Sequence, residues 1–75
     1  MNEFLKKVIL SNEQVVFSDD NSKVQVLNYG TAFKMVKFKN GSPVWHTDKT
    51  DIDSLIKSIK LDISKMNENY KVEVM

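Results

Sequence analysis

The chain of 75 residues has no cysteine and no arginine, and it contains only two glycines, one proline and one histidine. The lack of cysteine excludes disulfides, iron–sulfur clusters and thiolate zinc sites, and it is typical of a reducing compartment such as the cytoplasm. The lack of arginine removes the rigid bidentate group that most often reads guanine edges and phosphates. A sequence-specific DNA-binding function is therefore disfavoured.

Long hydrophobic runs are missing as well. The longest apolar runs, at residues 8–10 and 15–17, are far shorter than the ~20 residues that cross a bilayer. Lys6 and Lys7 precede the first run as they would in a signal peptide, but the run is too short and no small-residue cleavage site follows. We therefore expect an unexported, cytoplasmic protein with no membrane partner.

The charges nearly balance, and the motifs of common cofactor sites do not occur. The chain has eleven lysines and ten acidic residues. Its basic residues are all lysine, and it has seven asparagines. This composition resembles that of proteins encoded in AT-rich genomes, including those of low-GC bacteria and their phages. Gly30 and Gly41 are isolated, so no nucleotide-binding loop is indicated. His46 has no second histidine or cysteine with which to hold zinc, and no nucleophile motif accompanies it. We expect no cofactor, no metal site and no catalytic residue.

The strongest pattern lies in residues 51–66. Its apolar residues recur every three or four positions and so share one stripe of an α-helix: Ile52, Leu55, Ile56, Ile59, Ile63 and Met66. Burying such a stripe stabilises the fold by roughly 1.5–3 kcal/mol per side chain before ordering entropy is subtracted. Thr50 is the expected N-cap, with Asp53 completing a capping box, and Asn67 or Asn69 is the expected stop.

Five other segments favour β-strands through alternation or through β-branched and aromatic residues: residues 14–18, 23–29, 32–39, 42–46 and 70–75. Residues 23–29 carry apolar side chains on both faces, so this strand is expected to be central. Tyr70, Val72 and Val74 of the last strand are expected to point inward.

The Asn-Gly dipeptide at residues 40–41 predicts a two-residue type I′ hairpin. This turn would pair Phe38 with Pro43 and Val36 with Trp45. Because proline cannot donate a ladder hydrogen bond, the second strand is expected at the edge of the sheet.

Residues 32–39 also suggest a candidate binding surface. A β-bulge at Met35 and Val36 would put three lysines on one face of the sheet: Lys34, Lys37 and Lys39. Lys23, Tyr29, Trp45 and His46 are expected near them. Lysines beside aromatic rings suit a non-specific single-strand platform. Alternating lysines are also the ordinary solvated face of a sheet, and we favour this interpretation because the net charge is only +1.

Two further segments leave alternatives open. Residues 1–10 fit a short helix with a stripe of Phe4, Leu5, Val8 and Ile9, although Val8 and Leu10 alone would suit a strand; we favour the helix. Leu61 lies about 180° around the helix from Ile52. An isolated exposed leucine is ordinary, but together with other exposed apolar groups Leu61 would mark a partner or self-association contact.

The sequence thus predicts one α+β domain over residues 1–75: a mostly antiparallel sheet of four to five strands, packed on one face by the helix 51–66, with a short helix near the N-terminus. The expected function is that of a small non-enzymatic protein-interaction module, of phage or prophage accessory type, which binds a protein partner or a second copy of itself. The alternative is a weak, sequence-independent nucleic-acid binder that uses the lysine surface.

Overall fold

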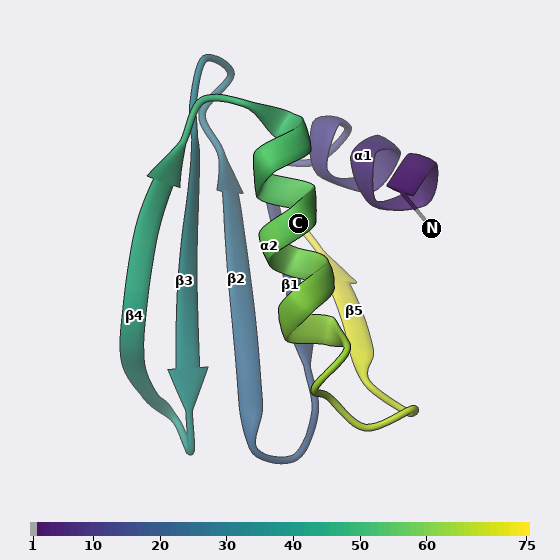
Figure 1. Ribbon diagram of the computed structural model, residues 1–75, viewed down its shortest axis with the longest axis vertical. Helices are drawn as coiled ribbons and strands as arrows, with labels where there is room; N and C mark the ends of the chain where they lie inside the picture. Colours follow the sequence, from purple (N-terminus) through teal and green to yellow (C-terminus); the bar gives the residue numbers. More distant parts are fainter. Residues whose placement is uncertain (1) are drawn as a thin grey trace.

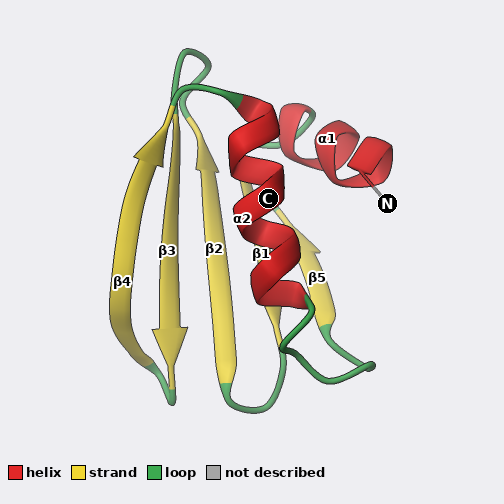
Figure 2. Ribbon diagram, in the orientation of Figure 1, coloured by secondary structure: helices red, strands yellow, loops and turns green. Residues whose placement is uncertain are grey.

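Two helices and five strands make up the part of the chain that the structure describes. The computed structural model describes residues 2–75, without the side chain of Asn2, so the expectation for Met1 lies outside the described residues. In chain order the elements are α1 (Asn2–Leu10), β1 (Gln14–Ser18), β2 (Ser22–Asn28), β3 (Phe33–Lys39), β4 (Ser42–Lys49), α2 (Ile52–Ile63) and β5 (Lys71–Val74) (Figures 1 and 2). The strands form one antiparallel sheet in the order β4-β3-β2-β1-β5. The predicted α+β class is confirmed.

The amphipathic stripe of α2 packs against the sheet. Its buried residues are Leu55, Ile56, Ile59 and Ile63, with Ile52 and Met66 partly buried beside them. They share one core cluster with side chains from the three middle strands: Val15, Phe17, Val24, Val26, Phe33 and Met35. Figure 1 shows α2 lying over one face of the sheet. Apolar burial on this one face therefore supplies the core of the protein.

Helix α2 begins one residue later than expected. Asp51, not Thr50, is the N-cap, and its Oδ2 accepts a hydrogen bond from the Ser54 N–H at 3.1 Å. The predicted capping box with Asp53 is therefore wrong. A carboxylate at the cap satisfies a free N–H and also opposes the positive end of the helix dipole, which a threonine does not.

The end of α2 also differs from the prediction. The helix stops at Ile63, and the chain continues in tighter turns, with the Met66 N–H bonded to the Ile63 carbonyl at 2.9 Å. Neither Asn67 nor Asn69 takes the left-handed conformation, since Asn40 is the one non-glycine residue between 2 and 75 with a positive φ. The predicted asparagine stop is wrong because these short-range hydrogen bonds already satisfy the last carbonyls.

The N-terminal segment is a helix, as favoured. Leu5 and Ile9 of α1 are buried in the core, and Val8 packs against it. Phe4 was expected on the same stripe, but it is 56% exposed. A helix of nine residues that touches the core at one edge can bury only a narrow stripe, and Phe4 falls outside it.

The β3–β4 hairpin turns at Asn40 and Gly41 as predicted, with φ values of 51° and 84°. Phe38 pairs with Pro43, but Val36 pairs with His46 instead of Trp45, because the register shifts between Lys37 and Phe38. The bulge predicted at Met35 and Val36 is therefore wrong: the extra residue lies in β4. Strand β3 alternates without a break, and this decides where its lysines point.

The sheet order confirms that β2 is central and that β4, which contains Pro43, is an edge strand. Strand β5 forms the other edge, beside β1. Tyr70 packs against the core, but Val72 and Val74, predicted to point inward to a buried position, are 39% and 52% exposed. They face the helix side of the sheet, but neither helix covers them, so their predicted burial is wrong.

Candidate functional site

The sheet has one face without a helix, here called the open face. Core residues of β1, β2 and β3 point toward the helices, so the residues between them point to the other side. Strand pairing extends this face to both edges, and its members are Val16, Lys23, Gln25, Leu27, Lys34, Val36, Phe38, His46, Asp48, Lys71 and Glu73. Both helices lie on the opposite side (Figure 2).

The middle of the open face is apolar. Four side chains, here called the apolar centre, are neither fully buried nor fully exposed: Val16, Leu27, Val36 and Phe38. Each lies two residues along a strand from the next or diagonally across a strand pair, so they form one connected patch. The Nζ atom of Lys23 sits 4.4 Å from the centre of the Phe38 ring and covers part of it.

The border of the open face carries charges of both signs. Lys34 and Asp48 are directly opposite each other on β3 and β4. Lys71 and Glu73 alternate with the valines of β5. His46, opposite Val36, is exposed at the β4 edge. An apolar patch inside a mixed polar rim is the arrangement found in protein–protein interfaces.

The three lysines of the proposed surface do not share a face. Lys34 lies on the open face, whereas Lys37 and Lys39 follow Phe33 and Met35 on the helix side. The predicted single lysine surface is wrong, because it depended on a bulge in β3 that occurs in β4 instead.

Lys37 has a structural position between the hairpin and α2. Its Nζ lies 3.0 Å from Oδ1 of Asp62, whose side chain is only 11% exposed, and 4.4 Å from the centre of the Trp45 ring. Within the described residues, Oδ2 of Asp62 has no hydrogen-bond partner. Lys37 thus links β3, β4 and α2, and this contact occupies the ammonium that the nucleic-acid hypothesis requires.

Tyr29 and Leu61, two further candidate residues, lie apart from each other. Tyr29 is 63% exposed in the β2–β3 connection, where it borders a depression of about 420 Å³ together with Leu27 and Met75. Leu61 is 61% exposed on the solvent side of α2, as predicted. Of the predicted set, the structure brings Lys37 and Trp45 together on the helix side, whereas Lys34 and His46 are diagonal neighbours on the open face.

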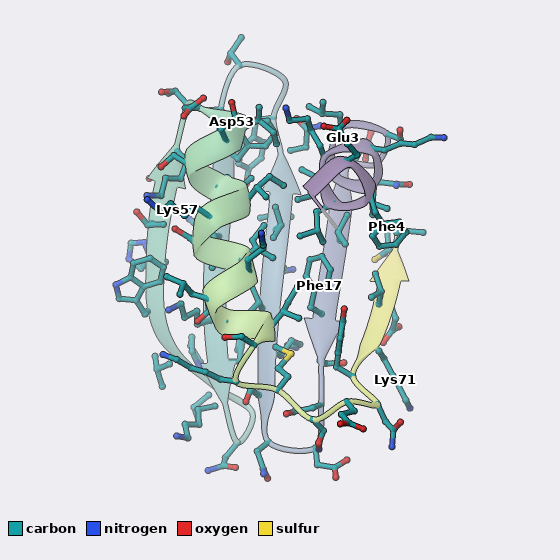
Figure 3. The ribbon with its side chains drawn as sticks, turned by 45° about the vertical axis from the view of Figure 1, so that its right-hand side comes forward. Glu3, Phe4, Phe17, Asp53, Lys57 and Lys71 are labelled. Atoms are coloured by element: carbon teal, nitrogen blue, oxygen red, sulfur yellow. The ribbon has the colours of Figure 1, made fainter. Side chains whose placement is uncertain are left out.

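Leu61 borders a groove of about 620 Å³ that lies between the two helices. Glu3 of α1 and Asp53 and Lys57 of α2 lie around it (Figure 3). The Lys6 ammonium bridges the helices, 3.1 Å from Oδ1 of Asp53. Its hydrogen bond and charge attraction to this carboxylate raise the pKa of Lys6 above its usual value.

Asp19 joins the β1–β2 turn to the segment after α2. Its Oδ1 accepts hydrogen bonds from the N–H groups of Asn21 at 2.9 Å and Ser22 at 2.8 Å, and its Oδ2 accepts one from Asn67 at 3.1 Å. These three backbone donors stabilise the charged form and lower the pKa of Asp19. Asp19 therefore has a structural role, since it joins these two segments through their backbone N–H groups.

Between residues 2 and 75, no three histidine, aspartate or glutamate side chains are close enough together to hold a metal ion. Neither helix in this part of the chain has the length and apolar character that crossing a bilayer requires. Comparison of the chain with models of known protein families, with curated proteins and with solved structures finds no match.

Reasoning from the sequence missed the apolar centre as a unit. In the alternating residues 23–29, Leu27 points to the other face of the strand from Val24 and Val26. An apolar residue on that face is the signal for a second apolar surface. Continuing strict alternation through residues 33–39 would have added Val36 and Phe38 to it. The supposed bulge in β3 obscured this pattern.

Proposed function

We propose that this chain is a small non-enzymatic protein-interaction module that binds a protein partner through the open face. The observation that carries the proposal is the apolar centre, which no helix covers and which a rim of both charge signs surrounds. Apolar patches of this kind on small proteins mark interaction sites. A rim of mixed charge supplies orientation and selects against wrong partners.

The dimensions of the open face limit the interface. Five strands at ~4.8 Å spacing span about 19 Å, so a partner that covers the face buries an area at the low end for stable complexes. We therefore expect a binding mode in which Val36 and Phe38 on β3 supply most of the affinity and the charged rim adds specificity.

The cellular setting belongs to the same proposal. A composition rich in lysine and asparagine and lacking arginine favours an accessory protein of phage or prophage type that acts on a host protein. The lack of cysteine is typical of proteins that work in the reducing cytoplasm.

A Val36→Glu variant tests the proposal, because it puts a carboxylate in the apolar centre. Tagged wild-type chain, Val36→Glu and the control Leu61→Glu are used to capture proteins from host cells, and the captured protein is then titrated in purified form against each variant. We expect wild type and Leu61→Glu to bind it and Val36→Glu to bind at least roughly tenfold more weakly. Circular dichroism checks that each variant is folded. Equal binding by all three variants, or no partner for wild type, contradicts the proposal.

The nucleic-acid alternative has less support, because Lys34 and Lys37 lie on opposite faces and Lys37 is paired with Asp62. Titration of a labelled single strand at two salt concentrations separates the two functions. Binding that weakens steeply with salt, and that is lost when Lys34, Lys37 and Lys39 are all changed to alanine, would favour the alternative over the protein-interaction module.

A further inference from the structure

The two edges of the sheet differ in how well they are protected. On β4, Pro43 lacks an N–H and the register shift distorts the strand, and both features hinder the addition of another strand. The other edge strand, β5, has neither a proline nor a register shift. Its outer side is therefore the better place on this sheet for a further strand to pair.

The backbone of β5 offers hydrogen-bonding groups on that outer side. Met75 and Gln14 exchange both of their backbone hydrogen bonds, at 2.9 and 3.4 Å. In an antiparallel ladder the bonded pairs alternate, so Glu73 and Lys71 also direct their N–H and C=O groups toward β1. Val72 and Val74 direct their N–H and C=O groups away from β1, toward the free edge of the sheet.

The side chains of the same residues add apolar surface. Val72 is 39% exposed and Val74 is 52% exposed, on the helix side of the sheet. Phe4, which is 56% exposed, projects from α1 near the tip of β5 (Figure 3). The helix-side side chains of a strand added at this edge would pack beside the two valines.

We propose that the strand added at this edge is β5 of a second copy of the chain, antiparallel and centred on Val72. This register sets Lys71 of each copy against Glu73 of the other, twice, at the closely spaced positions where side chains interact most. It also sets Val72 against its own counterpart, with both backbone groups of each available to bond. Centring the pair on Glu73 would oppose two carboxylates, and centring it on Lys71 would oppose two ammonium groups.

The geometry of such a dimer has a clear consequence for the open face. Two antiparallel edge strands of the same kind are related by a two-fold axis perpendicular to the sheet. Both copies then keep their helices on one side, and the two open faces form one continuous surface. Because β5 has only four residues, the dimer is weak and depends on concentration.

Two charge reversals and their mixture test the inference by sedimentation equilibrium over a range of concentrations. Wild type should dimerise. Lys71→Glu and Glu73→Lys should each have a dimer dissociation constant at least roughly tenfold higher than that of wild type, because each variant places like charges opposite each other at both pairs. An equimolar mixture of the two variants should dimerise again, because every pair then has opposite charges. Recovery in the mixture also shows that both variants fold.

Lys49→Glu is the matched control, since it makes the same charge change as Lys71→Glu on the opposite edge strand; it should dimerise like wild type. The inference is overturned if wild type is monomeric at every soluble concentration. It is also overturned if both single variants dimerise like wild type, if the mixture fails to recover, or if the control is as weak as Lys71→Glu. None of these measurements involves the partner of the open face, so the two proposals can fail separately.

Discussion

Ile59 and Leu61 lie two residues apart on α2, but Ile59 is fully buried and Leu61 is 61% exposed. Ile59→Ala should lower the free energy of unfolding by about 2–5 kcal/mol, through lost burial and the cavity left behind. Leu61→Ala should change it by less than about 0.5 kcal/mol. Chemical denaturation followed by circular dichroism measures both values.

The free energy of unfolding of the whole domain is expected to be only ~4–11 kcal/mol at this chain length. Ile59→Ala should therefore bring the protein close to unfolding at ambient temperature. A similar loss of stability in the two variants would mean that the helix presents a different side to the sheet.

Lys37 is the residue whose role differs most between sequence and structure. Lys37→Met keeps most of the side-chain stem but leaves the carboxylate of Asp62, which is 11% exposed, without its ion partner. We expect a loss of about 1–3 kcal/mol in the free energy of unfolding. Lys39→Met, on the exposed end of the same strand, should cost less than about 0.5 kcal/mol. If the two variants unfold at the same denaturant concentration, the ion pair contributes nothing measurable.

At the scale of elements, Asp19 holds the β1–β2 turn to the segment between α2 and β5. Asp19→Asn keeps one carbonyl oxygen for the turn but loses the charge and the acceptor that bonds Asn67. The variant should have a lower denaturation midpoint than wild type at neutral pH, and Asp19→Ala a lower one still. Urea denaturation monitored by circular dichroism gives the midpoints.

The effect of Asp19 should depend on pH in a defined direction. The pKa of its carboxyl is lower in the folded chain than the ordinary value of 3.8. The charged carboxylate therefore stabilises the folded state more than the neutral carboxyl group does. Its stabilisation is present above the unfolded-state pKa and is lost as pH falls through the lower folded-state pKa. The difference between wild type and Asp19→Asn should therefore shrink on acidification below about pH 4. A difference that grows in acid would contradict the assignment.

The elements themselves could be predicted from local patterns to a large extent. The stripe of α2, the alternation of β2 and the turn at Asn40 and Gly41 are short-range features, and each formed as expected. The position of the β-bulge could not be predicted, because a bulge on either strand of the hairpin relieves the same mismatch. Packing of Met35 in the core and of Lys37 against Asp62 favours the bulge in β4.

At the scale of the molecule, one core cluster joins both helices to β1, β2 and β3. The domain should therefore unfold in a single transition, with far-UV circular dichroism and Trp45 fluorescence changing at the same denaturant concentration. Trp45 lies on β4, which adds no buried residue to the core, so its fluorescence reports on the edge. An earlier fluorescence transition would show that β4 unfolds on its own.

Leu5→Ala provides the control for this prediction, because Leu5 connects α1 to the same core. Both signals should shift together, by about 2–4 kcal/mol in the free energy of unfolding. A shift in the circular dichroism alone would mean that α1 folds independently of the sheet.

The sequence by itself determined the class of the fold, the order of helices and strands, the central place of β2 and the edge position of the strand with Pro43. Periodicity, turn propensity and the missing N–H of proline are properties of neighbouring residues, so they can be read without knowing what lies across the sheet. Only the tertiary structure decided which face each lysine occupies, that Val72 and Val74 stay exposed, and that an apolar centre is left uncovered. Those outcomes depend on which strand takes up an extra residue and on how much of the sheet α2 can cover, and both are set by packing between segments far apart in the chain.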